Sequence, residues 1–142
     1  MGEESGLIVR AAAEQDLAAI ALIQSLAPEA SQWNPRDYLV FETRVAVRDG
    51  SVKGFIVARR VVDSEWEILN LAVAAEARRQ GIGRQLLGEI LSTGRGSFYL
   101  EVRESNTAAR QFYERAGFMV VTKRLRYYSN PEETAIVMNF HS

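Results

Sequence analysis

The segment EARRQGIGRQLL, at residues 76–87, constrains the fold of this chain more than any other stretch. It follows the aliphatic run WEILNLAV, which predicts a strand, and it leads into apolar residues at helical spacing. Gly81 and Gly83 lack Cβ atoms, so the backbone of this turn can approach a ligand closely. The first amides of a helix favour an anion, and Arg78, Arg79 and Arg84 add positive charge beside them. The segment therefore predicts a strand, a turn suited to a diphosphate, and a helix.

Other phosphate-binding turns are excluded by particular residues. A Walker loop requires a lysine and a hydroxyl residue after its last glycine, and neither follows these glycines at that spacing. A dinucleotide-binding fingerprint requires a third glycine, where this chain has Leu86, and AAEARRQ separates Gly81 from the strand. An ordinary tight turn with solvated arginines remains the alternative to a phosphate site.

The rest of the pattern predicts seven strands and four helices. We expect a strand at residues 7–10, a helix at 14–27, a short helix from Pro35 and a hairpin around Asp49 and Gly50. The strand SFYLEVRES precedes a helix that begins with Ser105 as its cap and ends at Gly117, and a last hairpin crosses SNPEE. The order β-α-α-β-β-β-α-β-α-β-β predicts an α+β fold, with a mixed, mostly antiparallel sheet and helices on its faces.

Composition limits the function. The 142 residues fit one domain, residues 1–142, and a net charge of −1 gives no reason to expect nucleic-acid binding. The chain has no cysteine, which excludes an acyl-cysteine route, and its one histidine, His141, argues against a histidine triad or a metal site. The acidic N-terminus is not a signal peptide, and no apolar run approaches the roughly 20 residues that span a membrane. A cytoplasmic location is expected.

A resemblance to a known family follows from the motifs. The hexapeptide RRQGIG, residues 78–83, matches (Q/R)xxGx(G/A), the acetyl-CoA pyrophosphate motif of the GNAT superfamily of N-acetyltransferases. The segments NLAVAAEARRQGIGRQLL, LEVRESNTAARQFYERAGF and RLRYYSNPEETAIVMNF follow in that superfamily's order and spacing. More narrowly, they resemble the ribosomal-protein-alanine N-acetyltransferases of the RimI type. The resemblance covers roughly residues 7–140.

This resemblance implies a fold and a cofactor site. The GNAT fold has a seven-stranded sheet flanked by four helices, and two central strands splay apart, here LNLAV and FYLEV. Pantetheine lies in the gap against the backbone of the first strand, and the pyrophosphate lies on the turn that follows. The residues expected to hold acetyl-CoA are Leu71, Ala72, Val73, Arg78, Arg79, Gln80, Gly81, Ile82, Gly83, Arg84, Asn106 and Tyr113.

Three side chains are candidates for acid–base chemistry. Because the chain has no cysteine, we expect the amine to attack the thioester directly in a ternary complex. The resemblance makes Glu101, in the strand YLEVR, the first choice for the base, with Glu67 as its competitor. By pattern alone each is a half-exposed strand residue. The resemblance also makes Tyr113 the acid that protonates the leaving thiolate, although by pattern alone it is a core aromatic.

The acceptor site is less defined. Trp33 and Tyr38 are expected to form one wall and Tyr127 and Tyr128 the other, with Glu101 between them. Ordinary packing explains each aromatic residue equally well.

The leading hypothesis is an acetyl-CoA-dependent N-acetyltransferase that acts on a protein N-terminus, such as the alanine of a small-subunit ribosomal protein. An N-terminal amine, with a pKa of about 8, loses its proton more easily than a lysine. Transfer to a small amine or a lysine, and a CoA-binding module without chemistry, are the alternatives. Glu132 and Glu133 are interpreted as a solvated turn, and Glu104 has no interpretation. The sequence carries no signal of oligomeric state, and a monomer or weak dimer is expected.

Overall fold

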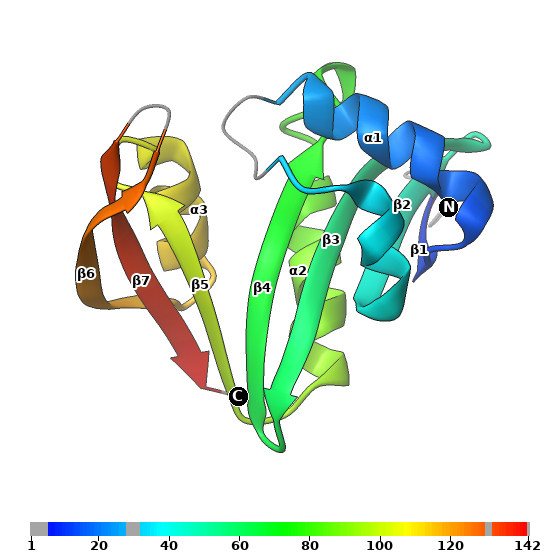
Figure 1. Cartoon of the computed structure of the whole chain (residues 1–142). Helices are drawn as coiled ribbons and strands as arrows, with labels where there is room; N and C mark the ends of the chain where they lie inside the picture. The colour runs from blue at the N-terminus through cyan, green and yellow to red at the C-terminus, as the bar shows by residue number, and fades with distance from the viewer. Residues whose placement is uncertain (1–5, 28–31, 130–131, 142) are drawn as a thin grey trace.

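The structure, a computed structural model, describes residues 6–27, 32–129 and 132–141. Seven strands lie within these ranges and form one sheet in the order β1-β2-β3-β4-β5-β7-β6 (Figure 1). The strands are β1 (Leu7–Ala11), β2 (Glu42–Arg48), β3 (Ser51–Val62), β4 (Glu65–Val73), β5 (Ser97–Arg103), β6 (Met119–Tyr128) and β7 (Glu133–His141). Within the described residues, the pair of β4 and β5 is parallel and every other neighbouring pair is antiparallel. The predicted mixed sheet is confirmed.

Helices cover both faces of the sheet (Figure 1). The helix α1 (Leu17–Ser25) and the 3-10 helix η3 (Pro35–Val40) pack on one face, and α2 (Ile82–Thr93) and α3 (Thr107–Arg115) pack on the other. Short 3-10 turns, η2 (Glu14–Asp16) and η4 (Ala75–Ala77), precede α1 and α2. The predicted helix from Pro35 is thus a 3-10 helix. No helix in the described part of the chain is long and apolar enough to cross a membrane.

The turns follow the residues that were expected to make them, with one exception. Asp49 and Gly50 both adopt left-handed backbone angles, with φ of 53° and 77°, and join β2 to β3 as a tight hairpin. Gly117, with φ of 106°, follows the end of α3. The predicted cap Ser105 is wrong: α3 is capped by Asn106, whose Oδ1 accepts a hydrogen bond from the Ala109 amide at 3.1 Å.

Two groups of buried side chains hold the layers together. On one face, Ile82, Leu86, Leu87 and Ile90 of α2 are each at most 1% exposed and pack against the sheet. Full burial of each such side chain is worth about 1.5–3 kcal/mol. On the other face, Ile20 of α1 packs with residues of η3, β2, β3 and β4. Because α2 is anchored so firmly, the glycine turn that precedes it has a fixed position.

The central strands β4 and β5 splay apart, and this opens the cleft. They pair only at their first residues, from Glu65 with Ser97 to Glu67 with Tyr99. Beyond this point β4 carries a bulge against β3, because Asn70 pairs with Val57 while Ile68 pairs with Ala58. A bulge bends a strand and increases its twist. The two strands therefore diverge, as the resemblance implied, and each half of the sheet contributes one side of the opening.

Candidate active site

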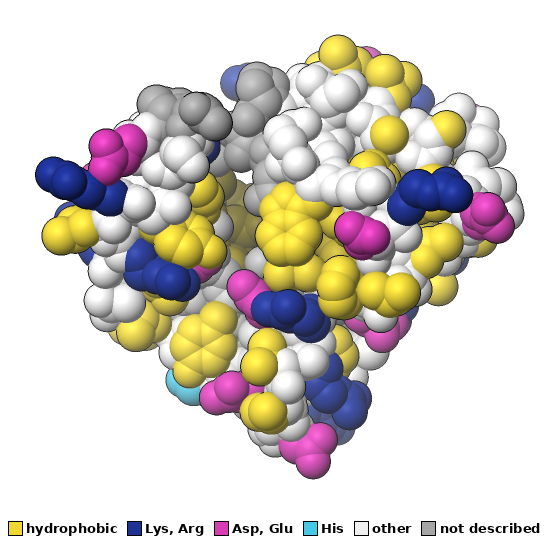
Figure 2. Space-filling model, viewed as in Figure 1, with side chains coloured by type: hydrophobic (Ala, Val, Ile, Leu, Met, Phe, Trp, Pro, Cys, Tyr) yellow, Lys and Arg dark blue, Asp and Glu magenta, His cyan; other side chains and the backbone are white. Residues whose placement is uncertain are grey.

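A cleft of about 1140 Å³ lies in the gap between β4 and β5. Residues of β4 line one side, and residues of β5 and α3 line the other. Gln32 and Trp33 border it from the segment before η3, and Tyr127 and Tyr128 border it from the end of β6. Figure 2 shows this face of the molecule hollowed between its two halves, with hydrophobic side chains along the edges. The splay thus produces a cavity of a size suited to small-molecule ligands.

The glycine turn lies at one end of this cleft. A second cavity of about 250 Å³ is lined by Val73, Ala77, Arg78, Arg79, Gly81, Ile82, Gly83, Arg84 and Phe112. Gly81 immediately precedes α2 and has φ of 79°, which favours glycine. A Cβ on Gly83 would meet the Phe112 ring at 3.5 Å, an ordinary contact. Arginine side chains and helix amides therefore surround a site that suits a diphosphate.

Gln80, which was also expected to hold acetyl-CoA, is not among the residues that line that cavity. Its side chain accepts a hydrogen bond from Arg48 of β2 and donates one to the Glu76 carbonyl at 3.5 Å. Arg78 borders both cavities, and its Nε donates to the Val73 carbonyl at 3.3 Å. These contacts join the turn to the ends of two strands, so the turn is held on both sides.

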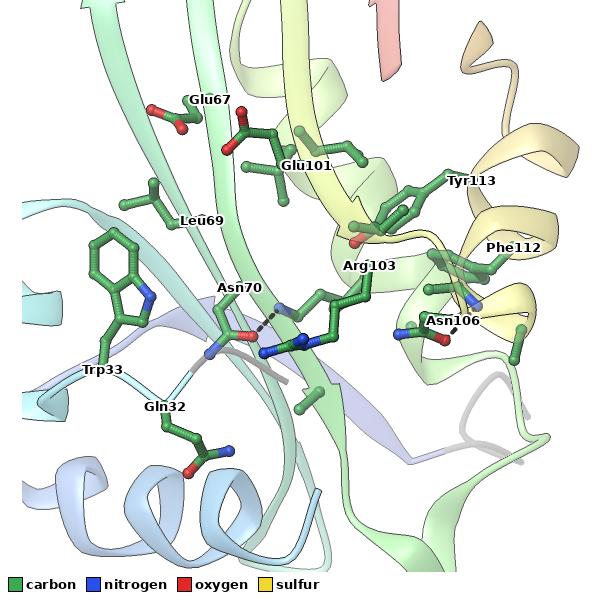
Figure 3. A pocket seen from close by; sticks show the side chains of 18 of the residues that line it. Gln32, Trp33, Glu67, Leu69, Asn70, Glu101, Arg103, Asn106, Phe112 and Tyr113 are labelled. Carbon is green, nitrogen blue, oxygen red and sulfur yellow. Dashed lines mark hydrogen bonds between the residues drawn. The ribbon is translucent and has the colours of Figure 1, made fainter. Parts of the chain in front are cut away.

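The strand face expected to hold pantetheine lines the middle of the cleft. Leu71, Ala72 and Val73 all border it, and so does Asn106 from the start of α3 (Figure 3). Since Asn106 Oδ1 caps α3, that oxygen is already occupied by the helix. Asn70, which the sequence analysis did not single out, also lines the cleft, and its Oδ1 accepts from the Leu71 amide at 3.0 Å.

Glu101 extends from β5 into the cleft, with 17% of its side chain exposed (Figure 3). Its carboxylate accepts a hydrogen bond from Arg124 Nη1 of β6 at 2.5 Å. This bond raises the pKa of Arg124. The Arg124 guanidinium lies over the Tyr127 ring, 4.2 Å from its centroid. A carboxylate is thus held at the cleft wall by a charged partner.

Glu67 lies in β4 near the same end of the cleft and pairs with Arg59 of β3 (Figure 3). Its side chain is 30% exposed, more than that of Glu101. Burial is the largest cause of the raised pKa of Tyr127, and the bond to Glu101 is the largest cause for Arg124; the charges of both carboxylates add to each shift. Both candidate bases therefore lie where an amine that reached this end of the cleft would meet them.

Tyr113, the candidate acid, lies on α3, on the side of the cleft opposite β4. Only 7% of this residue is exposed. Its ring makes edge contacts with Phe112 and Phe118, and its hydroxyl points into the cleft (Figure 3). Burial raises the pKa of this phenol well above its usual value of about 10. The hydroxyl therefore stays protonated near neutral pH and can donate a hydrogen bond to an anion that forms beside it.

Aromatic side chains border the end of the cleft where the acceptor amine is expected to bind, here called the acceptor end. Trp33 is 45% exposed on one rim. On the other rim the rings of Tyr127 and Tyr128 meet edge-on, with centroids 5.2 Å apart. Burial, aided by the charge of Glu101, raises the pKa of Tyr128 to about 12. The guanidinium of Arg103 lies 4.5 Å from the centroid of the Tyr128 ring. These rims come from segments far apart in the sequence.

Two expectations about this end of the molecule are wrong. Tyr38 does not form a wall of the cleft, because it is fully buried, stacks on Phe55 and donates its hydroxyl hydrogen bond to Gln24. Glu133 is not a solvated turn residue, because its carboxylate accepts from the Ser105 amide at 2.6 Å and from Arg103 at 3.2 Å. These bonds lower its pKa, with those from Ser105 as the largest cause.

Sequence reasoning missed several residues at the site. Asn70, Arg103 and Phe112 line the cleft, and Arg124 holds Glu101. A period-two count places Arg103 on the face of Glu101 and could have found it. Glu104, which had no interpretation, pairs with Lys123 of β6 at 3.3 Å and is a surface residue outside the cleft lining.

Known proteins resemble this chain in sequence and in fold. The sequence profile of the acetyltransferase (GNAT) family matches residues 8–118. The [ribosomal protein bS18]-alanine N-acetyltransferase of Escherichia coli (strain K12) is 37% identical over 107 residues, which cover 71% of this chain and 70% of that protein. The crystal structure of the ribosomal-protein-S18-alanine N-acetyltransferase from Escherichia coli superposes with a TM-score of 0.81 at 28% identity, over 94% of this chain and 92% of that one.

A plant protein shares the fold. Arabidopsis thaliana Naa50, in complex with the bisubstrate analogue CoA-Ac-MVNAL, superposes with a TM-score of 0.82 at 22% identity, over 96% of this chain and 99% of that one. The family profile and the bacterial relative confirm the resemblance inferred from the motifs. The chain therefore belongs to the acetyltransferase (GNAT) family and is an N-acetyltransferase.

Proposed function

We propose that this enzyme transfers acetyl from acetyl-CoA to the N-terminal amine of a protein, and that the first residue of the acceptor is alanine. One observation carries the proposal: a single cleft joins the arginine-lined turn to a rim that holds Glu101, Glu67 and exposed aromatic residues. A donor at one end and an amine at the other would meet beside Tyr113.

The residues of the turn fit the diphosphate of CoA. Gly81 immediately precedes α2 with a left-handed angle, and Arg78, Arg79 and Arg84 line the adjoining cavity. The free amides of a helix start and the positive side chains both favour phosphate oxygens. Leu71 and Val73 would meet the pantetheine arm in the middle of the cleft. Acetyl-CoA would supply the acetyl thioester, and the chemistry around it falls to the protein side chains.

Those side chains have distinct roles. Glu101 would accept the proton of the incoming ammonium group, directly or through water, so that the neutral amine can attack the acetyl carbon. The new bond joins that nitrogen to the acetyl carbon, the nitrogen loses a second proton as the amide forms, and the bond from the acetyl carbon to sulfur breaks. Tyr113 would donate its proton, or a hydrogen bond, to the sulfur that leaves, and the second proton of the amine, carried by water, would restore the phenol. Arg124 would hold Glu101 in place through its ion pair.

The acceptor class is proposed from the rims and the relatives. The aromatic side chains of Trp33, Tyr127 and Tyr128 border the cleft, and an extended peptide that lay between these two rims would bring its N-terminus to Glu101. The Escherichia coli relative is named for the alanine of ribosomal protein bS18. Naa50, which shares the fold, was solved with an analogue that joins CoA to an acetylated peptide. A ribosomal acceptor would place the reaction in the cytoplasm.

The test is an acetylation assay followed by intact-mass and fragment mass spectrometry. The enzyme and acetyl-CoA are incubated with a peptide that begins with alanine, the same peptide with a blocked N-terminus and a free lysine, and a small primary amine. We expect one acetyl group on the free N-terminus. Modification of the lysine or the small amine alone would contradict the proposal. Tight CoA binding without turnover on any acceptor would show a binding module instead.

A further inference from the structure

Three buried polar side chains lie behind the acceptor rim, and we call them the Gln24–Tyr38–Asn70 cluster. Gln24 comes from α1, Tyr38 from η3 and Asn70 from β4. The exposed fractions of these three residues are 5%, 0% and 7%, respectively. Polar groups that are so buried require partners, since each one left without a hydrogen bond costs about 1–3 kcal/mol. The partners therefore reveal what the cluster holds.

The amide of Gln24 is at the centre of the cluster. Its Oε1 accepts hydrogen bonds from the Tyr38 hydroxyl at 2.5 Å and from Asn70 Nδ2 at 3.1 Å. Asn70 Nδ2 also donates to the Tyr38 hydroxyl at 3.1 Å. With its oxygen occupied in this way, Gln24 directs its Nε2 outward, where it donates to the Trp33 carbonyl at 2.6 Å.

The cluster thus connects the Trp33 rim to β4. At its outer end it holds the backbone of Trp33, and Gln32 adds a second tie by donating from its Nε2 to the Gln24 carbonyl at 3.0 Å. At its inner end Asn70 accepts from the Leu71 amide, on the strand that faces the cofactor side. Asn70, Gln32 and Trp33 all border the cleft (Figure 3).

Folding alone does not require this arrangement. The same face of the sheet is already filled by Ile20, Ile23, Phe55 and Val57, all buried. When all members of such a cluster are replaced together by apolar side chains of the same shape, the change in stability can be close to zero. What the polar cluster adds is direction, because a hydrogen bond to a particular carbonyl fixes the position of that backbone. Apolar packing does not select between neighbouring positions in this way.

We infer that the Gln24–Tyr38–Asn70 cluster is a positioning device that sets the Trp33 rim at the distance from β4 that the acceptor requires. The inference rests on the proposed function, since it assigns acceptor binding to that rim. It makes Gln24 a positioning residue, which acts on the acceptor through the Trp33 backbone. Loss of the bond from Gln24 to the Trp33 carbonyl should weaken acceptor binding and leave acetyl-CoA binding little changed, because the glycine turn lies at the far end of the cleft.

The test uses Gln24→Met, which keeps the length of the side chain and removes the donor to the Trp33 carbonyl. We expect KM for the N-terminal peptide to rise about 10-fold, with KM for acetyl-CoA within about 2-fold of wild type and kcat little changed, the pattern of lost binding. The control is Ile20→Val, which trims a fully buried residue one turn earlier on α1. The control should leave both KM values unchanged even if it lowers the melting temperature.

A second readout follows the rim itself. The chain has two tryptophans, Trp33 and Trp66, so a Trp66→Phe background leaves Trp33 as the single reporter. In that background Gln24→Met should increase acrylamide quenching of Trp33 fluorescence, and Ile20→Val should not. If Gln24→Met does not fold, Tyr38→Phe replaces it, since this variant removes a single hydroxyl. It should raise peptide KM a few-fold and also increase the quenching of Trp33.

The outcomes separate the two proposals. Unchanged peptide KM and quenching in a folded Gln24→Met variant would overturn the positioning role. An equal rise of KM in Ile20→Val would also overturn it, since the effect would then reflect packing alone. If the wild-type enzyme acetylates no N-terminal peptide, the proposed function fails. The quenching experiment and the KM for whichever amine is accepted still decide on the cluster.

Discussion

The two ends of the cleft are built in different ways. The end where we propose that the CoA phosphates bind, here called the phosphate end, is lined mostly by one continuous segment, residues 77–84, with Val73 of β4 and Phe112 of α3 beside it. The acceptor end is assembled from the segment before η3, from β4 and β5, and from the end of β6. A contiguous site needs only local backbone geometry, whereas an assembled site depends on every layer of the fold. Substitutions at the two ends should therefore differ in kind, with acetyl-CoA KM affected at one and acceptor KM or turnover at the other.

The largest difference is expected in kcat, between variants of the two carboxylates at the acceptor end. Glu101→Gln should lower kcat by about 10²–10⁴-fold, because loss of a general base commonly costs that much. Glu67→Gln should lower kcat by less than about 10-fold, since in our proposal it does not take the proton. Initial rates at saturating acetyl-CoA, with an alanine peptide and over a range of pH, measure both. A larger loss in Glu67→Gln would assign the base to β4 instead.

Tyr113→Phe should come next, with kcat lowered by about 10²-fold and acetyl-CoA KM within about 2-fold of wild type, because the phenol acts on the sulfur that leaves. Single-turnover rates separate this step from product release. Phe112→Leu is a matched control on the same helix, since it changes packing against the cleft and leaves the hydroxyl in place. An unchanged single-turnover rate in Tyr113→Phe would rule out the proton-donor role.

The same tyrosine gives a pH dependence. Burial raises the pKa of Tyr113 above its unfolded value of about 10, so the folded state holds its proton more tightly than the unfolded state. Its contribution to stability is complete below about pH 10 and is lost as the pH rises through the folded-state value. Urea midpoints should fall above about pH 10 in the wild type and fall less steeply in Tyr113→Phe. Parallel curves for the two proteins would contradict the burial argument.

The phosphate end is tested by its glycines. Gly81→Ala places a Cβ on a residue with φ of 79°, which costs about 1–2 kcal/mol and should raise acetyl-CoA KM several-fold by shifting the turn. Gly83→Ala should be milder, because its Cβ would make an ordinary contact with Phe112 at 3.5 Å. Gly88→Ala, further along α2 in open space, should stabilise the protein by about 0.5–1 kcal/mol and leave kinetics unchanged. Kinetics and thermal melts compare all three variants.

The smallest effect concerns the acceptor end at low pH. Hydrogen bonds from Ser105, with Arg103, lower the pKa of Glu133, so its contribution to stability is present above the unfolded value and is lost as the pH falls below it. The wild type should lose stability on acidification below about pH 4.3, and Glu133→Gln should lose less. Glu132→Gln, at the neighbouring exposed residue, should follow the wild type. Urea midpoints between about pH 3 and 6 measure the difference.

Sequence patterns predicted the fold because its elements carry local signals. Asp49 and Gly50 made the hairpin, Gly117 ended α3, and the apolar face of α2 is buried as its spacing required. Ser105 was wrong as a cap, since a neighbouring Asn can cap the same helix and local sequence does not choose between them. Of the candidate site residues, Glu67, Glu101 and Tyr113 lie together at the cleft.

The sequence by itself determined the glycine turn of this protein and its family. A strand, a glycine turn and a helix N-terminus are contiguous, so residue order alone specifies their geometry and the kind of anion they suit. Only the tertiary structure decided the acceptor end. Tyr38 was expected as a wall of the acceptor site and Glu133 as a solvated turn residue, but distant segments bury the first and bond to the second. Arg124 reaches Glu101 only because β6 and β7 fold back beside β5. Burial and pairing are properties of the assembled layers, and no local pattern records them.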